Sequence, residues 1–415
     1  MKKSILLAAL LAVTIGASAQ SMKVQSAYSD MKNERLANAK KNIDEACLNE
    51  KTKDDPKTWN YAGLIYAQIV DASNNNKKLF KKQKIDTPVE ELCATGIKAL
   101  RTSLELEQKA CTHEYSSSSI EALKVLCGYE YMYAGNTYND GSYEKAANMF
   151  AKVIEDAKIA QHKDLMLDAM YYQADCYRML KQPEKEMSIY REMAKNNTNK
   201  ADVYLKIYNA NKQAGDTTKA LNALKKGVKM TANDASNNMI MKSTLASAYL
   251  WAKQPTEADK ILNELMEKGK DDPKTLNAIG GIYVDQSLTE KAIEIYTKSI
   301  SIDPKQLDAQ RGIGLANFNK AVDLITEANN IPPEDQAGYD KKLAESYSYF
   351  EKAIPYFNNA LALKDNDFVS LKALKTIYSR LGGSTTLDAA KKDEYKKAYQ
   401  DVSVRLDKLI TITIQ

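Results

Sequence analysis

The side chains best suited to metal binding and nucleophilic catalysis, histidine and cysteine, are scarce in this sequence. Two histidines and five cysteines occur among 415 residues. Cys111, His113 and Cys127 offer possible zinc ligands, but they lack the C-x2-C or H-x3-H spacing that brings two ligands to one metal. We therefore expect no metal site there, and we expect His162, in AQHKD, to lie in a solvated turn.

Motifs of the common catalytic and phosphate-binding sites are also missing from the sequence. It contains no Gly-rich phosphate loop, no G-x-S-x-G elbow and no H-E-x-x-H motif. Two acidic pairs, Asp54-Asp55 and Asp271-Asp272, each come directly before a proline. An Asp before a Pro is typical of a helix N-cap, where the helix dipole favours negative charge. We therefore expect these acids to cap helices, and we expect no enzyme activity and no cofactor.

The N-terminus has the features of a secretory signal peptide. Two lysines precede the apolar run ILLAALLAVTIG, and Ala17-Ser18-Ala19 forms an A-x-A cleavage site. We predict that residues 1–19 are removed by cleavage after Ala19, so that the mature chain starts at Gln20 and is periplasmic or secreted. A retained N-terminal anchor is the alternative. No later segment is apolar over ~18 residues, so the mature chain is expected to have no transmembrane segment.

The odd number of cysteines leaves at least one without an internal partner in an exported chain. Cys111 and Cys127 flank a Ser-rich turn and form the pair best placed for a disulfide bridge. The alternative is that the cysteines are small buried apolar residues, a common role for free cysteine. The sequence leaves the disulfide status open for all five positions: Cys47, Cys93, Cys111, Cys127 and Cys176.

The charge balance argues against nucleic-acid binding. The formal charge of +5 falls to +3 once the two signal-peptide lysines are removed, and a nucleic-acid site needs a clustered basic face. A local run of five lysines occurs in NNNKKLFKKQK. Because acidic residues surround this run, we interpret it as a solvated insertion loop. Contact with an anionic surface or an acidic partner is the alternative for these residues: Lys77, Lys78, Lys81, Lys82 and Lys84.

Two distant stretches of the chain are nearly identical, which indicates an internal repeat. DDPKTWNYAGLIY at residues 54–66 and DDPKTLNAIGGIY at residues 271–283 share nine of thirteen letters. In the second copy, Leu276, Ile279, Gly280 and Tyr283 follow helical spacing and define one face of a helix. A second helical pattern of Ala292, Tyr296 and Ser299 follows, and Pro304 ends it. Each copy is thus expected to be a helix–turn–helix unit of about 34 residues.

This spacing resembles the tetratricopeptide repeat, whose first helix carries W-x2-L-G-x2-Y and whose second carries A-x3-F-x2-A before a closing proline. Small residues such as Gly280 and Ala292 allow the two helices to cross closely. The first copy fills the same positions with Trp59, Gly63 and Tyr66. Less regular copies of the repeat occur along the rest of the chain. The anchor residues of the second helices are Ala39, Gly96, Ala146, Glu186, Ala220, Ala258, Ala292 and Ala353.

The resemblance implies an all-α fold, a right-handed solenoid of about eight helical hairpins whose neighbours stack into one core. We expect the regular solenoid over residues 20–304. Residues 305–415 are expected to hold further repeat-like units, a long insertion at 316–346 and a polar capping helix at 387–409. A second insertion is expected at 74–92, where the lysine run lies.

The resemblance also implies a function, since such repeats mainly bind other proteins or peptides. We expect an exported, non-enzymatic scaffold; a module that binds a small ligand or glycan is the alternative, and the oligomeric state stays open. Within the family, the face of the first helices that the motif leaves free lines a concave groove. Packing between helices is the competing role for Tyr171 and Trp251. The expected groove residues are Tyr171, Asp175, Arg178, Asn209, Lys212, Ser247 and Trp251.

Overall fold

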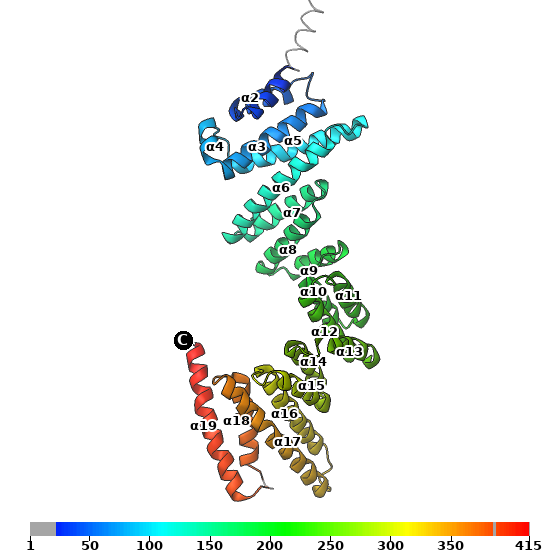
Figure 1. Ribbon diagram of the computed structural model, residues 1–415, viewed down its shortest axis with the longest axis vertical. Coiled ribbons are helices and arrows are strands. Elements are labelled where there is room, and N and C mark those ends of the chain that lie inside the picture. The colour runs from blue at the N-terminus through cyan, green and yellow to red at the C-terminus, as the bar shows by residue number, and fades with distance from the viewer. Residues whose placement is uncertain (1–21, 385–386, 415) are drawn as a thin grey trace, which may run out of the picture. The chain divides into compact units, whose positions relative to one another are not determined.

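The computed structural model describes residues 22–384 and 387–414, and within these ranges the protein is built from helices and contains no strand (Figure 1). A helical stretch covers residues 22–32, and eighteen further helices, α2 to α19, follow. The predicted all-α fold is therefore confirmed. The predicted signal peptide, residues 1–19, lies outside the described residues.

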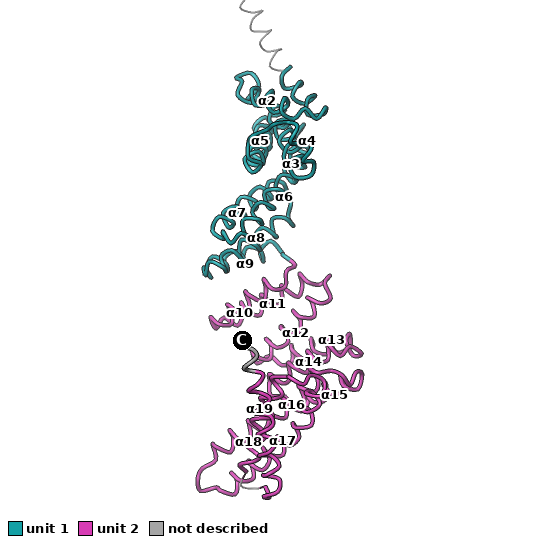
Figure 2. Tube along the Cα trace, turned by 90° about the vertical axis from the view of Figure 1, so that its left-hand side faces the viewer, with its two compact units in different colours: residues 1–198 teal, residues 199–415 magenta. Residues whose placement is uncertain are grey.

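The chain divides into two compact units, residues 1–198 and 199–415, which Figure 2 shows in separate colours. The boundary that we predicted after residue 304 falls inside the second unit and stays a prediction about where the repeats change. In unit 1, helix α3 pairs with α5, α6 with α7 and α8 with α9. The helices of unit 1 are α2 Leu36–Cys47, α3 Pro56–Asn75, α4 Lys77–Gln83, α5 Val89–Ala110, α6 Ser116–Asn139, α7 Tyr143–Ile159, α8 Lys163–Met179 and α9 Pro183–Lys195.

Unit 2 continues the same pattern of paired neighbours. Contacts are extensive within the pairs α10 with α11, α12 with α13, α14 with α15, α16 with α17, and α18 with α19. The helices of unit 2 are α10 Ala201–Gln213, α11 Thr217–Met230, α12 Ala235–Trp251, α13 Pro255–Gly269, α14 Pro273–Asp285, α15 Thr289–Ile302, α16 Leu307–Asn329, α17 Gln336–Leu363, α18 Phe368–Gly382 and α19 Ala389–Ile414.

The two Asp-Pro sequences begin helices as predicted. The Asp55 carboxylate accepts a hydrogen bond from Lys57 N at 3.0 Å, and the helix starts at the proline that follows. Asp272 accepts from Lys274 N and Thr275 N, at 3.2 and 3.0 Å. These bonds satisfy backbone donors that have no partner in the first turn of a helix. The second acid of each pair, Asp55 and Asp272, is therefore a capping group.

Glycines mark the places where the two helices of a hairpin approach each other closely. A Cβ atom added at Gly280 of α14 would lie 2.8 Å from the Tyr296 ring of α15, and one at Gly63 would lie 2.2 Å from Leu100. Gly312 of α16 faces the same ring, since its added Cβ would lie 2.2 Å from Tyr296 Cζ. The buried Tyr296 ring therefore lies between glycines of two successive hairpins.

The structure also locates the other motif residues. Tyr66, Tyr283 and Ala292 are buried. Trp59 is half-buried and donates a hydrogen bond from Nε1 to Lys53 O at 2.6 Å. Pro304 lies exposed in the turn between α15 and α16.

The insertion predicted at 316–346 consists of extra turns on two long helices, which are separated by a break at NNIPPEDQ as the sequence indicated. Residues 316–329 extend α16 and residues 336–346 begin α17, and the turn between them contains the two adjacent prolines. Extra turns added to both helices of one hairpin lengthen the repeat without adding a loop. Helix α18 follows, and α19 packs on it through buried Val402 and Leu406.

All five cysteines lie within the described residues and carry free thiols. Cys93, Cys127 and Cys176 are buried, which agrees with the alternative that cysteine serves here as a small apolar residue. The bridge considered between Cys111 and Cys127 is absent. Cys111 is exposed at the C-terminal end of α5, whereas Cys127 faces the core from within α6.

Candidate functional site

In unit 2, the first helices of two successive hairpins, α14 and α16, lie side by side and present polar side chains to one groove. Pro273 and Leu307 begin these helices 34 residues apart, which is one repeat period. Lys274 and Asn277 of the first helix therefore correspond to Asp308 and Arg311 of the second. The motif residues of α14 point inward, so these four positions form the stripe that the motif leaves free.

A pocket of about 510 Å³ lies along this stripe, within the size range of ligand sites in proteins. Its walls combine charged and amide groups with small apolar surfaces. Burial raises the pKa of Tyr296 at its base to about 12, so that hydroxyl stays protonated. The pocket is lined by Lys274, Asn277, Ala278, Tyr296, Gln306, Asp308, Arg311, Gly312 and Leu315.

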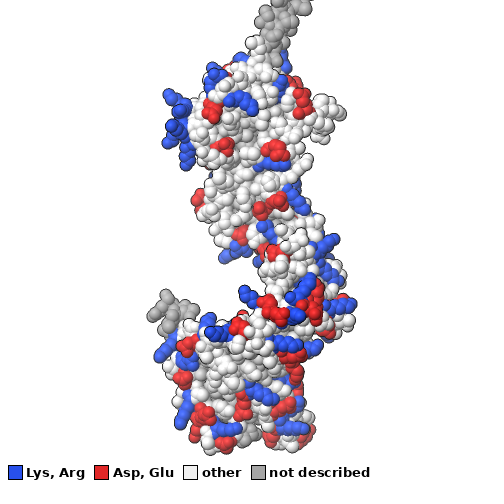
Figure 3. Space-filling view, in the orientation of Figure 1, with Lys and Arg blue, Asp and Glu red and all other residues white. Residues whose placement is uncertain are grey.

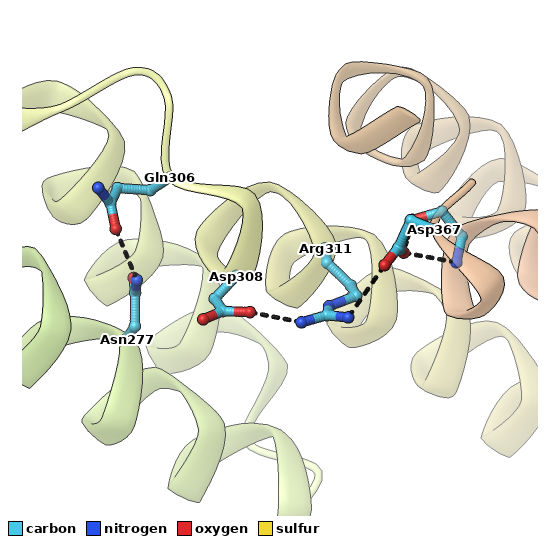
Figure 4. Close-up of polar contacts among 6 residues, drawn as sticks. Asn277, Gln306, Asp308, Arg311 and Asp367 are labelled. Carbon is cyan, nitrogen blue, oxygen red and sulfur yellow. Dashed lines mark hydrogen bonds and ion pairs between the residues drawn. The ribbon is translucent and has the colours of Figure 1, made fainter. Parts of the chain in front are cut away.

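Arg311 is held in place by carboxylates on two sides (Figure 4). Its guanidinium pairs with Asp308 on its own helix and with Asp367 at 3.2 Å. Asp367 is buried and caps α18 by accepting hydrogen bonds from Ser370 N at 3.0 Å and Ser370 Oγ at 2.7 Å. The guanidinium is therefore fixed in orientation, and α16 is tied to the start of α18.

Asn277 and Lys274 retain capacity to bind a ligand. The Asn277 amide donates to Gln306 Oε1 at 3.2 Å, and its own oxygen is buried without a hydrogen-bond donor. A buried acceptor without a donor costs about 1–3 kcal/mol. Within the described chain, Lys274 takes part in no ion pair. The pocket can therefore take a ligand that carries both hydrogen-bonding and apolar groups.

Three of the groove residues predicted from the sequence lie on α8 in unit 1. Asp175 pairs with Arg178, whose Nε lies 2.7 Å from Asp175 Oδ1, and it also accepts a hydrogen bond from the Tyr138 hydroxyl. The carboxylate raises the pKa of Arg178. The ring of Tyr171 meets that of Tyr172 edge-on, with centroids 6.3 Å apart. Asp175 and Arg178 are thus brought together, while Tyr171 belongs to an aromatic cluster.

The remaining four predicted residues lie in unit 2, on α10 and α12. Lys212 Nζ lies 5.2 Å from the centroid of the Trp251 ring, a cation–π distance. Asn209 is exposed, and Ser247 and Trp251 are half-buried. The structure joins Lys212 and Trp251 in one contact. Trp251 therefore packs against a neighbouring helix, whether or not it also contacts a partner.

A smaller aromatic pocket lies in unit 1 between α6 and α8. It measures about 160 Å³, and the Phe150 and Tyr172 rings stack in its wall with centroids 5.7 Å apart. Tyr172 and Met132 remain 40% and 38% exposed, which leaves apolar surface at the rim. The sequence analysis missed this pocket. Its lining is Tyr131, Met132, Gly135, Asn136, Tyr138, Asn139, Phe150 and Tyr172.

The pocket at α14 and α16 was also missed, although the sequence contains a signal for it. The free positions of the repeat at 273–304 are Lys274 and Asn277, and one period later they are Asp308 and Arg311. We applied this rule only to residues 168–251. We did not extend it past residue 304, where we expected further repeat-like units with a long insertion at 316–346.

In the described part of the chain, no group of three or more His, Cys, Asp and Glu side chains is arranged to hold a metal ion. None of the helices in this part is long and apolar enough to span a bilayer.

Comparison with known proteins identifies the repeat. Residues 273–306 and 168–199 each match a family model described as the tetratricopeptide repeat. No curated protein sequence matches this chain. The antiparallel helical pairs, with glycines at their crossings, define a helical-repeat protein. Together with the two family matches, they show that the chain contains tetratricopeptide repeats, and such repeats support a role as a scaffold for protein or peptide interaction.

Several solved structures have a similar fold. The C-terminal part of a TPR repeat-containing protein from Cytophaga hutchinsonii is 14% identical, with 68% of this chain and 98% of that chain covered and a TM-score of 0.41. YrrB, described as a TPR protein with an unusual peptide-binding site, is 17% identical, with 55% and 99% covered and a TM-score of 0.32. The human IFIT1 dimer with PPP-AAAA is 15% identical, with 83% and 73% covered and a TM-score of 0.34.

Proposed function

We propose that this protein is an exported, non-enzymatic scaffold of the cell envelope that holds a peptide segment of another protein in the groove of its first helices. The observation that carries the proposal is the pocket at α14 and α16, where Lys274, Asn277 and Arg311 converge beside apolar surface. A peptide supplies all of the matching groups, since its backbone donates and accepts hydrogen bonds and its side chains fill apolar space.

Peptide recognition fits the electrostatics of this pocket. Arg311 is already paired with two carboxylates, so it acts as a fixed hydrogen-bonding wall. Lys274 supplies the charge that is not neutralised within the described chain. Asn277 lines the pocket beside Lys274 and adds an amide group to its wall. Export rests on the predicted signal peptide and is part of the same proposal.

Site-specific photocrosslinking tests this function. A photoreactive phenylalanine analogue is placed at Ala278 in the pocket, and the full chain is expressed in its native cells and irradiated. We expect a discrete set of adducts, identified by mass spectrometry as peptides of one protein. Adding Lys274→Glu and Asn277→Leu to the same chain is expected to remove these adducts.

The matched control places the same analogue at Thr297, which is exposed on α15. Adducts that form equally at Thr297, or that persist when Lys274 and Asn277 are changed, would show that the pocket does not select them. A small molecule bound in place of a peptide would appear as a mass adduct without peptide fragments, and that result would favour the alternative of a ligand-binding module.

A further inference from the structure

The short helix α4 carries a concentration of positive charge that the groove does not use. Lys77, Lys78, Lys81 and Lys82 lie on this seven-residue helix, and Lys84 follows at its C-cap. All five side chains are exposed. We name these five residues the lysine ridge. Figure 3 shows basic side chains gathered over α4 at the edge of the molecule.

The lysine ridge lacks counter-charges of its own. Within the described chain, none of its five ammonium groups takes part in an ion pair. Acidic residues follow in the sequence from Asp86 onward, but none of their carboxylates forms an ion pair with a lysine of the ridge. Lysines elsewhere differ: Lys391 lies 3.9 Å from Glu351, and Lys396 lies 3.3 Å from Asp393. The ridge therefore keeps a local positive field that its neighbours do not cancel.

Helix α4 is fixed to the rest of unit 1, so the ridge is a built feature. The Asn76 side chain caps the helix by accepting from Leu79 N at 3.1 Å. At the other end, Gln83 donates from Nε2 to Glu34 O at 3.0 Å and accepts from Ala37 N at 3.2 Å. Leu79 and Phe80 pack against the core of unit 1. The apolar side chains thus face inward, and the lysines face out.

The residue types of the lysine ridge indicate the class of its partner. We propose that the lysine ridge docks unit 1 on an anionic phospholipid surface. Lysine is a compact point charge without the fixed fork of arginine, and it is depleted at protein–protein interfaces. The ridge also contains no arginine and no exposed aromatic ring, which binding to single-stranded nucleic acid commonly uses. Clusters of four to eight basic residues are typical of binding to anionic lipid headgroups.

The contact is electrostatic and does not insert into the bilayer, because Leu79 and Phe80 are occupied by the core. Such a contact weakens as salt shortens the screening length from about 10 Å at 0.1 M to about 3 Å at 1 M. Surface docking of unit 1 and peptide binding in unit 2 use different residues. Lipid docking of unit 1 is therefore a second function beyond the proposed peptide binding, and each can be tested without the other.

Vesicle co-sedimentation tests the lysine ridge. The chain from Gln20 onward is mixed with phosphatidylcholine vesicles, with or without phosphatidylglycerol, at low and high salt. We expect binding only to the vesicles with phosphatidylglycerol, and release at high salt. Glutamine at Lys77, Lys78, Lys81 and Lys82 is expected to weaken this binding by at least roughly tenfold, since each lysine near an anionic surface contributes attraction.

The matched control replaces four lysines of α19 by glutamine and so removes the same charge. Its helical signal and vesicle binding are both expected to equal those of the unchanged chain. Equal loss of binding in the two variants, or no binding of the unchanged chain to phosphatidylglycerol, would overturn the proposal. Binding to soluble polyglutamate or duplex DNA without binding to vesicles would overturn it in favour of another polyanion. The control positions are Lys391, Lys392, Lys396 and Lys397.

Discussion

A buried carboxyl group in unit 1 makes the stability of the protein depend on pH. Glu130 of α6 has a buried oxygen without a hydrogen-bond donor, and it faces Asp156 of α7. Burial and the Asp156 carboxylate raise the pKa of Glu130 from 4.5 to about 7, although Lys152 and Arg101 oppose the rise. Arg101 is committed to Asp156, whose carboxylate lies 3.0 Å from its Nη1.

The direction of the pH effect follows from this raised pKa. Between about pH 4.5 and 7 the folded state binds more protons at Glu130 than the unfolded state does. The stability is therefore fully present below pH 4.5 and is lost as the pH rises through 7. At ~1.4 kcal/mol per pH unit, the loss by pH 8 is about 3 kcal/mol. The pKa of Asp156 is also raised by burial, which adds to the change in the same direction.

The substitution Glu130→Gln keeps the shape of the side chain and removes its titration. We expect the variant to exceed the stability of the unchanged protein by less than about 1 kcal/mol at pH 5 and by about 3 kcal/mol at pH 8. The measurement is the urea midpoint followed by the helical signal of circular dichroism, with amide hydrogen exchange in α6 as a local readout.

The matched control is Glu121→Gln on the same helix. Glu121 is exposed and pairs with Lys124 at 2.7 Å, so its removal is expected to leave the pH dependence unchanged. Comparing each variant with the unchanged protein at both pH values cancels the contribution of all other groups. A stability difference between Glu130→Gln and the unchanged protein that is equal at pH 5 and pH 8 would show that the pKa of Glu130 is not raised by folding.

Three further predictions concern the repeat, the N-terminus and the groove. Gly280→Leu is expected to overpack the crossing of α14 and α15 and to cost about 1–3 kcal/mol; an unchanged urea midpoint would contradict the close crossing. Mass spectrometry of the envelope fraction is expected to find Gln20 at the N-terminus, whereas an intact Met1 or a lipid-modified terminus would contradict the predicted cleavage. The variant with alanine at Tyr171, Arg178 and Trp251 is expected to keep its helicity but to lose retention of whatever protein co-purifies with the unchanged chain. Full retention of that protein would remove these three residues from the binding surface.

Features that arise within one hairpin were predictable from the sequence. The Asp-Pro caps and the small residue at Gly280 each depend on a few neighbouring positions, and the structure contains both. The anchor residue Ala353 was also placed correctly in the second helix of its hairpin. These patterns are local, because an N-cap and a close helix crossing each require a particular type of residue at one position.

Features that depend on how hairpins meet were not predictable in the same way. The pairing of Glu130 with Asp156 joins two helices whose carboxyl groups are far apart in sequence and leave no shared motif. The link from Arg311 to Asp367 spans more than fifty residues and depends on the extended lengths of α16 and α17. Gln83 anchors α4 to the residues around Glu34. In the sequence it is one polar residue among lysines, and nothing there indicates this role.

The Tyr296 ring, enclosed by glycines of α14 and α16, has a consequence for how unit 2 unfolds. In a repeat array, cooperativity comes from the contacts between neighbouring repeats, since each repeat alone is unstable. Tyr296 belongs to one hairpin and fills the space against the next, so it stabilises the hairpin and its coupling to the neighbour at once. Loss of this ring would therefore broaden the unfolding transition as well as lower its midpoint, and the C-terminal hairpins would unfold as a separate block.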